Sequence, residues 1–170
     1  LDVNIHKIEG SDENNLQKSR TLSGMKNRRL QAALEDTLSV GGQLLVFVSS
    51  RASAAKEARV LSEFMLKLAK DNCSAISEGD IKKWNSLSKE ISIGGEDSST
   101  GSSLAKSAKG GVGFHHAGLT NRQRKAIERS FKNGDIKCIV ATPTLAQGVN
   151  LPARRAVSYT HLRAHETHDD

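Results

Sequence analysis

The sequence predicts an α/β protein in which parallel strands alternate with helices along the chain. Residues 43–48 and 136–141 are continuous apolar runs, as expected for strands that are buried on both faces of a parallel sheet. Segments with the apolar periodicity of helices lie beside each run. This alternation is typical of a doubly wound sheet, in which ligands bind at the carboxyl ends of the strands.

A short segment is expected to lead into this domain. Residues 3–8 alternate in polarity and predict a short strand, and residues 26–38 predict a helix with leucines on one face. The glycine pair at 41–42 ends that helix before the first apolar run. The sequence therefore predicts a lead segment over residues 1–37 and the main domain over residues 38–156.

Two further helices and a loop are predicted after the first apolar strand. Residues 54–69 carry an apolar stripe at helical spacing, and Ser53 is placed to cap that helix. Residues 79–92 predict another helix. Residues 94–111 are rich in Ser and Gly and have no apolar period, so we expect a flexible loop with at most one helical turn, near residues 104–108.

The next helix has clear start and stop signals. Residues 112–115 predict a short strand, and the capping-box pattern of Thr120 and Gln123 then opens a helix over residues 121–132. Gly134 suits the left-handed position that commonly follows a helix. These local signals fix both ends of the predicted helix.

The apolar run 136–141 leads directly into a predicted helix start. Thr142 is a good N-cap residue, and Pro143 suits the first helical position, where its missing N–H costs nothing. A helix N-terminus at the carboxyl end of a strand presents unpaired N–H groups and a positive dipole end, which suit a phosphate. Gly148 lets the chain turn away, and Asn150 offers an amide that can meet a nucleotide sugar.

Three strand tips therefore carry candidate contact residues: 49–51, 115–118 and 142–150. Each tip also has a purely structural interpretation. The Ser-Ser-Arg sequence can be a helix cap with an exposed arginine, the two histidines can be a structural pair, and the third tip can be an ordinary strand–turn–helix joint. A soluble α/β domain without any nucleic-acid role therefore stays among the alternatives.

Two segments resemble a known family when they are taken together and in this order. They are FHHAGL at Phe114–Leu119 and ATPTLAQGVNLPARR at Ala141–Arg155. This sequence resembles the second RecA-like domain of superfamily two helicases, within the Ski-like branch that includes archaeal DNA-repair helicases related to the helicase part of polymerase theta. The resemblance runs from about Leu38 to Arg155 and implies a RecA-like parallel sheet flanked by helices, truncated at both ends.

The resemblance implies a role for each matching residue. Residues 45–51 match helicase motif IV, residues 114–119 with Gln123 and Arg124 match the following motif, and residues 142–150 match motif V. The residues implied to contact the nucleic-acid backbone are Ser49, Ser50, Arg51, His116, Ala117, Gly118, Arg124, Thr142 and Thr144. The residues implied to face the nucleotide are Gly148 and Asn150. No catalytic residue and no metal ligand is expected.

The family's catalytic motifs are missing from this sequence. No GxxxxGK[ST] loop, no acidic DExH-type box and no Gln-x-x-Gly-Arg motif occurs. The resemblance therefore implies a fragment of an ATP-dependent 3′–5′ DNA helicase that is inactive alone. ATP and magnesium would be bound mainly by the first RecA-like domain, which would be one partner, with single-stranded or forked DNA as the other. An RNA helicase of the same branch and a non-catalytic nucleic-acid binding domain are the alternatives.

The last residues resemble a translated sequencing adapter. Residues 157–167 match, codon for codon, one reading frame of a transposon adapter, so we expect residues 157–170 to be non-native and to form no strand from residue 158 onward. The spacing of His161, His165 and His168 imitates a zinc site, but no metal site is expected in such a tail.

The composition is compatible with a nucleic-acid partner. The formal net charge is +6, and it becomes +8 without the tail, which holds one basic and three acidic side chains. Aromatic residues are only 4%, which argues against base-stacking platforms. Cys73 and Cys138 are expected to be free thiols in a reducing cytoplasm, and no apolar run reaches the length of a membrane span.

Overall fold

The structure is a computed structural model of the 170-residue chain. It describes residues 4–7, 20–21, 28–93, 98–147, 151, 153 and 155–159. Of residues 4–7, 20–21 and 146–147 it describes the backbone only.

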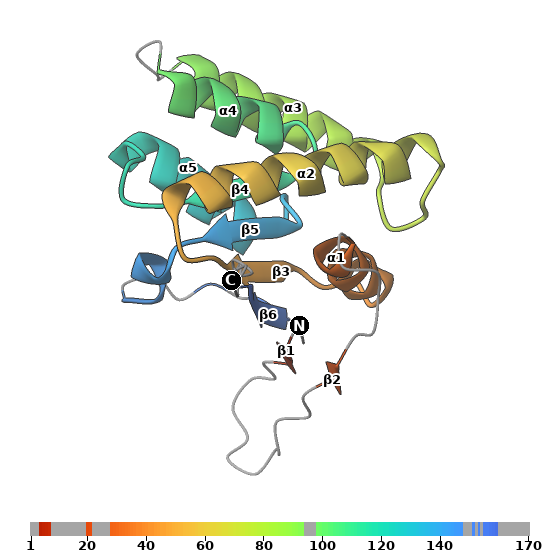
Figure 1. Ribbon diagram of the computed structural model, residues 1–170. Helices are drawn as coiled ribbons and strands as arrows, with labels where there is room; N and C mark the ends of the chain where they lie inside the picture. Colours follow the sequence, from red (N-terminus) through yellow and green to blue (C-terminus); the bar gives the residue numbers. More distant parts are fainter. Residues whose placement is uncertain are drawn as a thin grey trace, which may run out of the picture.

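The described strands form one sheet in the order β2-β1-β6-β3-β5-β4 (Figure 1). The parallel strands are β6 (Arg155–Ser158), β3 (Leu44–Phe47), β5 (Cys138–Ala141) and β4 (Val112–His115). Two antiparallel strands extend the sheet beyond β6, namely β1 (Asn4–Lys7) and β2 (Arg20–Thr21). The predicted parallel α/β sheet is confirmed, and the antiparallel extension was not predicted.

Helices cover the parallel part of the sheet. They are α1 (Arg29–Ser39), α2 (Arg51–Lys70), α3 (Glu78–Ile93), α4 (Ser99–Ala108) and α5 (Asn121–Lys132), with a 3-10 turn, η1, over Pro143–Gln147. Figure 1 shows α2 running across β4 and β5, with α3 and α4 packed together beyond the β4 end of the sheet. None of the described helices combines the length and the apolar character that a membrane span requires.

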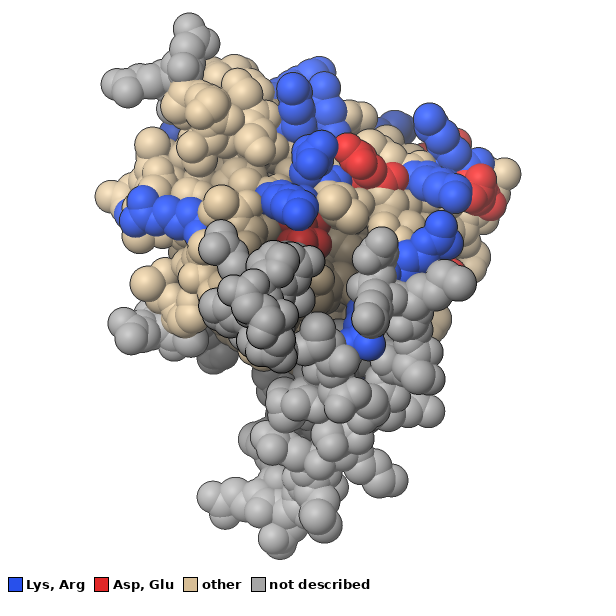
Figure 2. All heavy atoms as spheres, viewed as in Figure 1, with Lys and Arg blue, Asp and Glu red and all other residues tan. Residues whose placement is uncertain are grey.

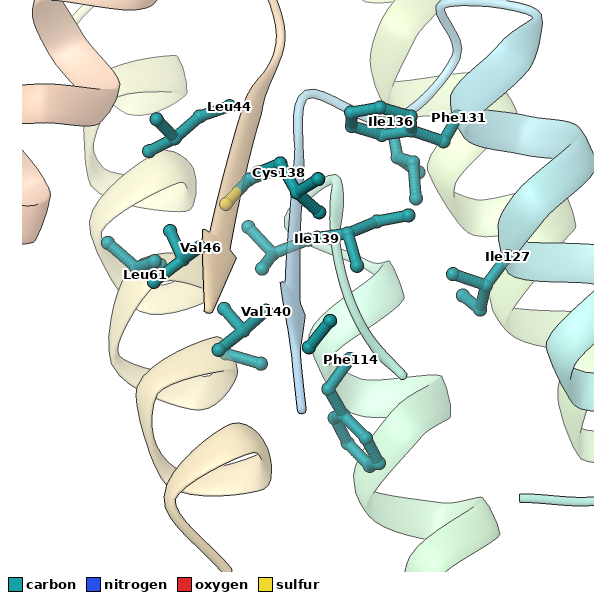
Figure 3. Close-up of a cluster of buried hydrophobic side chains, with 14 of the residues drawn as sticks. Leu44, Val46, Leu61, Phe114, Ile127, Phe131, Ile136, Cys138, Ile139 and Val140 are labelled. Atoms are coloured by element: carbon teal, nitrogen blue, oxygen red, sulfur yellow. The ribbon is translucent and has the colours of Figure 1, made fainter. Parts of the chain in front are cut away.

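The core lies on both sides of the central strands. Figure 3 shows Leu61 of α2 beside Val46 of β3, and Ile127 of α5 on the other side of β5; all three side chains are fully buried. Cys138 belongs to the same core, and its burial raises the pKa of its thiol, so the thiol stays protonated and inert. Cys73 and Cys138 are both free, as the sequence predicts.

The predicted ends of α5 are confirmed. The amide of Gln123 donates to Thr120 Oγ1 at 3.2 Å, and the Thr120 amide donates to Gln123 Oε1 at 2.9 Å. Gly134, which follows the helix, has a φ of 76°. Both signals act within a few residues, which is why the sequence alone locates them.

The predicted cap of α2 is wrong. The helix begins at Arg51, and its N-cap is Ser50, whose Oγ accepts a hydrogen bond from the Ser53 amide at 3.1 Å. Ser50 has the extended backbone of a residue that leaves a strand, with φ −138° and ψ 157°. The helix therefore starts as soon as the strand tip ends, and Arg51 lies in its first turn.

The predicted flexible loop is also wrong for residues 99–108, which form α4; residues 94–97 lie outside the described residues. Ser98 caps this helix by accepting from the Gly101 amide at 3.1 Å. The last carbonyls of a helix lack partners within it, and two of them accept from neighbouring helices. Ser88 Oγ of α3 donates to the Ala105 carbonyl at 2.7 Å, and Ser62 Oγ of α2 donates to the Ser107 carbonyl at 3.0 Å.

The expectation that no strand extends past residue 157 is wrong. Val157 pairs with Val46 and Ser158 with Phe47, both parallel, and the Tyr159 amide donates to the Phe47 carbonyl at 2.8 Å. Backbone pairing depends little on which side chain is present, and Val157 is fully buried. Residues 160–170, with the three tail histidines, lie outside the described residues.

Two glycines fit the end of α4 tightly against α2 and α3. A Cβ atom at Gly110 would lie 2.5 Å from the backbone oxygen of Ser62. Gly111 has a φ of 70°, and a Cβ there would lie 2.4 Å from Trp84. Trp84 is itself held by its indole N–H, which donates to the Asp135 carbonyl at 2.7 Å. The turn from α4 into β4 therefore admits no side chain.

We expect Gly110→Ala to lower the free energy of unfolding by about 1–3 kcal/mol, because the added methyl group meets rigid backbone. Gly79→Ala is the matched control, since the nearest atom to a Cβ there is Ser77 Oγ at 3.5 Å and the site lies within α3. This control should be neutral or stabilising by about 0.5–1 kcal/mol. Urea unfolding of both variants tests the packing, and equal losses would contradict it.

Candidate functional site

The structure brings the three predicted strand tips to one edge of the sheet. Phe47 and His115 both pair with Ala141, so β3, β5 and β4 end at the same level. The pairing continues just past the strands, where the Val48 amide donates to the Ala141 carbonyl at 2.9 Å and the Thr142 amide donates to the His115 carbonyl at 3.1 Å. Residues that are far apart in the sequence therefore become neighbours here.

At the tip of β3, only part of the predicted trio is available to a ligand. Ser49 is exposed. The hydroxyl of Ser50 donates to Ser53 Oγ at 2.9 Å while it accepts from the Ser53 amide, so it is occupied as a cap. Arg51 is exposed, and no carboxylate in the described part of the chain forms an ion pair with it.

The two histidines at the tip of β4 have different environments. His115 Nε2 lies 2.8 Å from Glu128 Oε1, so this ring ties β4 to α5. His116 stacks on Phe114, with ring centroids 5.5 Å apart, and its Nδ1 accepts from the Gly118 amide at 3.0 Å. The structural interpretation of the pair therefore holds for His115, which belongs to a candidate strand tip but is not among the residues that the resemblance implies to contact the backbone.

Burial lowers the pKa of His116, and electrostatic interactions with Arg51 and with His115 lower it further. At neutral pH the His116 ring is therefore uncharged. Because Nδ1 accepts a hydrogen bond from Gly118, the single ring proton belongs on Nε2. The ring is thus a neutral hydrogen-bond donor.

The helix predicted after β5 is a 3-10 turn. The amide of Leu145 donates to the Thr142 carbonyl at 3.1 Å, and η1 ends at Gln147. Thr142 is 8% exposed, and its Oγ1 lies 3.0 Å from Oγ1 of the exposed Thr144. The two hydroxyls form a pair, and the prediction of a helical N-cap is wrong because the five-residue turn is too short and too tightly wound.

The other predicted contacts divide between exposed and undescribed residues. Ala117 and Gly118 are exposed beside His116. Arg124 lies in the first turn of α5, where its guanidinium donates to Asn121 Oδ1. Gly148 and Asn150, which were predicted to face the nucleotide, lie outside the described residues.

The sequence prediction missed the contribution of α4. A hollow of about 520 Å³ lies beside the tips of β3 and β4. Besides the predicted residues Arg51, His116 and Gly118, its lining includes Ser99, Thr100, Ser103 and Phe114. The signal that could have located α4 is the apolar spacing of Leu104, Ala105 and Ala108, all buried on one face.

Charge alone does not mark this site. Figure 2 shows basic side chains spread over the face that carries α2 and α3, with acidic side chains among them.

Within the described residues, no three His, Cys, Asp or Glu side chains gather as a metal site would require. The strand tips instead offer hydroxyls, backbone amides, a neutral imidazole and a guanidinium. These groups can hold the oxygens of a phosphate.

Comparison with known proteins agrees with this geometry. Residues 95–168 match the helicase conserved C-terminal domain. The chain is 35% identical to the ATP-dependent DNA helicase Hel308 of Methanococcus vannielii over 159 residues, which are 92% of this chain and 20% of that protein. It is 40% identical to the Hel308 proteins of Thermoplasma volcanium and Caldivirga maquilingensis, over 73% and 75% of this chain and 16% of each relative.

The chain thus spans a fifth or less of the length of these relatives. Its parallel α/β sheet is nevertheless consistent with the helicase C-terminal domain that its sequence matches. Residues 95–168 therefore match the helicase conserved C-terminal domain, and most of the chain is similar to part of the archaeal Hel308 helicases.

Proposed function

We propose that this chain is part of an ATP-dependent DNA helicase, in which its strand tips hold the phosphates of one DNA strand. The observation that carries the proposal is the meeting of three tips at one sheet edge, with Arg51, Thr144 and Gly118 exposed there. The names of the relatives support the choice of DNA. The partners are single-stranded or forked DNA and a second RecA-like domain, and the location is the cytoplasm.

The proposed contacts address the DNA backbone and not the bases. Hydroxyls, amides and guanidinium groups bind phosphate oxygens regardless of the base that follows. Such contacts fix the position of a strand while they let it shift by whole nucleotides. A domain built in this way can hold a strand during one half of a cycle and release it in the other, with 3′–5′ movement as the family resemblance implies.

ATP and magnesium are proposed to bind mainly to the other RecA-like domain of the parent protein. The hydrolysis of ATP supplies the free energy for strand movement. Gly148 and Asn150 are the residues of this chain proposed to face the nucleotide, and both lie outside the described residues. The described residues contain no cluster that would hold the magnesium ion, so this chain's own contribution is to position the strand.

The chain should bind single-stranded DNA weakly and without sequence preference. We expect the logarithm of its affinity to fall against the logarithm of salt concentration with a slope of about −2 to −3, from about three or four phosphate contacts at roughly 0.7 each. Fluorescence anisotropy with labelled oligonucleotides measures both quantities. A slope near zero, or a strong preference for one sequence, would count against backbone binding, and equal affinity for RNA would favour the RNA helicase alternative.

Two substitutions separate the proposed roles within motif V. Thr142→Ala should weaken DNA binding because it removes a hydroxyl at the tip of β5, and Thr142→Ser should restore it. Asn150→Ala should leave DNA binding almost unchanged, because its proposed partner is the nucleotide. The same anisotropy assay, with melting curves to confirm folding, tests the pair. If both alanine variants bind as the parent does, or both lose the same affinity, the motif V assignment fails.

The chain alone should show no ATPase activity above background, with or without DNA. Phosphoryl transfer in this class of enzyme uses a phosphate-binding loop with its lysine and an acidic magnesium ligand, and neither motif occurs in this sequence. A coupled assay of phosphate release is sufficient. DNA-stimulated turnover of about 1 s⁻¹ or more, as is usual for enzymes, would refute the expectation.

A further inference from the structure

We propose that Glu128 of α5 is a positioning residue for the tip of β4, and that it acts through His115 to hold residues 116–118 in the arrangement that meets a DNA strand. The inference rests on the proposed function for the identity of the ligand. Neither Glu128 nor His115 is among the residues proposed to touch the strand, so the role is an addition to that function.

The two histidines of the β4 tip face opposite sides of the sheet, as successive residues of a strand do. His116 lines the hollow together with residues of α2 and α4. His115 faces α5, where its Nε2 lies 2.8 Å from Glu128 Oε1. Gly113 shares that side of the strand, and a Cβ atom there would lie 3.0 Å from Ile127 of α5. The α5 side of β4 is therefore closely packed, and the contact of His115 with Glu128 lies at its tip end.

The contact closes a loop around the tip. His115 and Glu128 are 13 residues apart in the sequence, and residues 116–118 lie between them. The capping box of Thr120 and Gln123 fixes the start of α5 within the same loop. Closing a loop removes conformations that a ligand would otherwise have to restrict when it binds. The contact therefore prepares the tip for binding.

The same histidine is joined to the tip of β5 through its backbone. The His115 carbonyl accepts from the Thr142 amide at 3.1 Å, and Thr142 Oγ1 lies 3.0 Å from Thr144 Oγ1. A displacement of His115 would therefore move the pair of threonine hydroxyls as well as residues 116–118. One contact with α5 thus bears on two of the three strand tips.

Stability alone does not explain a histidine at this position. The residue is 6% exposed, and its Nδ1 is buried without a hydrogen-bond partner in the described part of the chain. A buried polar atom without a partner costs free energy, and an apolar side chain of similar shape would avoid that cost. The chain thus carries a destabilising group where the strand is proposed to bind, as expected if the histidine serves binding.

A second contact between α5 and a carboxylate provides the matched control. Arg129 of α5 donates to Glu90 of α3 at 2.5 Å. This contact joins α5 to a neighbouring helix and not to a strand tip. Loss of the Glu90 carboxylate therefore removes a comparable contact of α5 and leaves the tip of β4 untouched.

The test is the affinity of the full 170-residue chain for oligo(dT), measured by fluorescence anisotropy. Glu128→Ala and His115→Phe should each weaken binding about three- to tenfold, the value of one hydrogen bond, and the double variant should lose no more than either alone. Glu128→Gln keeps an oxygen that accepts from His115 and should bind nearly as the parent chain does. Glu90→Ala should leave the affinity unchanged.

Melting curves separate positioning from a purely structural role. His115→Phe removes the unpartnered Nδ1, so it should melt no earlier than the parent chain while it binds DNA less tightly. If His115→Phe loses stability but keeps its affinity, the proposal is overturned. Equal losses of affinity from Glu128→Ala and Glu90→Ala, or losses that add in the double variant, also overturn it.

The mobility of the tip is a readout that does not depend on DNA. In ¹⁵N relaxation measurements, the amides of Ala117 and Gly118 should become more mobile on the picosecond to nanosecond timescale in Glu128→Ala, but not in Glu90→Ala. The amide spectrum shows at the same time that both variants are folded. Order parameters that do not change in Glu128→Ala would overturn the positioning role.

The outcomes also separate this inference from the proposed function. If oligo(dT) binds and Thr142→Ala weakens it, while Glu128→Ala and His115→Phe have no effect, the strand-binding role stands and the positioning role is refuted. If oligo(dT) does not bind to the parent chain, the proposed function fails, and this inference fails with it.

Discussion

The parallel pairing of β3, β5 and β4 is the constraint on which the candidate site depends. Ala141 pairs with Phe47 on one side and with His115 on the other, so three strands end together. Parallel strands require long crossover connections, and these connections carry α2, α3, α4 and α5. The same pairing therefore positions both the strand tips and the helix ends beside them.

The position of α4 is a second constraint, and it is set by buried polar contacts as much as by apolar packing. Ser62 and Ser88 donate to carbonyls in its last turn, where a helix cannot satisfy its own backbone. The close fit of Gly110 and Gly111 then leads the chain into β4 without any side chain in the way. With its end fixed in this way, α4 presents its beginning to the hollow beside Arg51.

The chemistry of this edge depends on directed donors more than on net charge. The basic excess is spread over the surface among acidic side chains, and such charges are screened by salt over about 10 Å at 0.1 M ionic strength. The guanidinium of Arg51, for which the described residues supply no ion-pair partner, and the neutral ring of His116 instead offer directed hydrogen-bond donors at this edge. This combination suits a ligand with phosphate oxygens.

The sequence by itself determined the features that arise from residues close together in the chain. The apolar runs located β3 and β5, the Thr120–Gln123 capping box located α5, and two motifs located the family. Only the tertiary structure decided that residues 99–108 form a helix, that Ser50 caps α2, that Val157 and Ser158 join the sheet, and that His116 rather than His115 lines the hollow. The physical reason is that most of these outcomes depend on partners far away in the sequence. The carbonyls at the end of α4 accept from Ser62 and Ser88, and β6 pairs with β3. The two histidines differ because His115 contacts Glu128, whereas His116 accepts from the amide of Gly118.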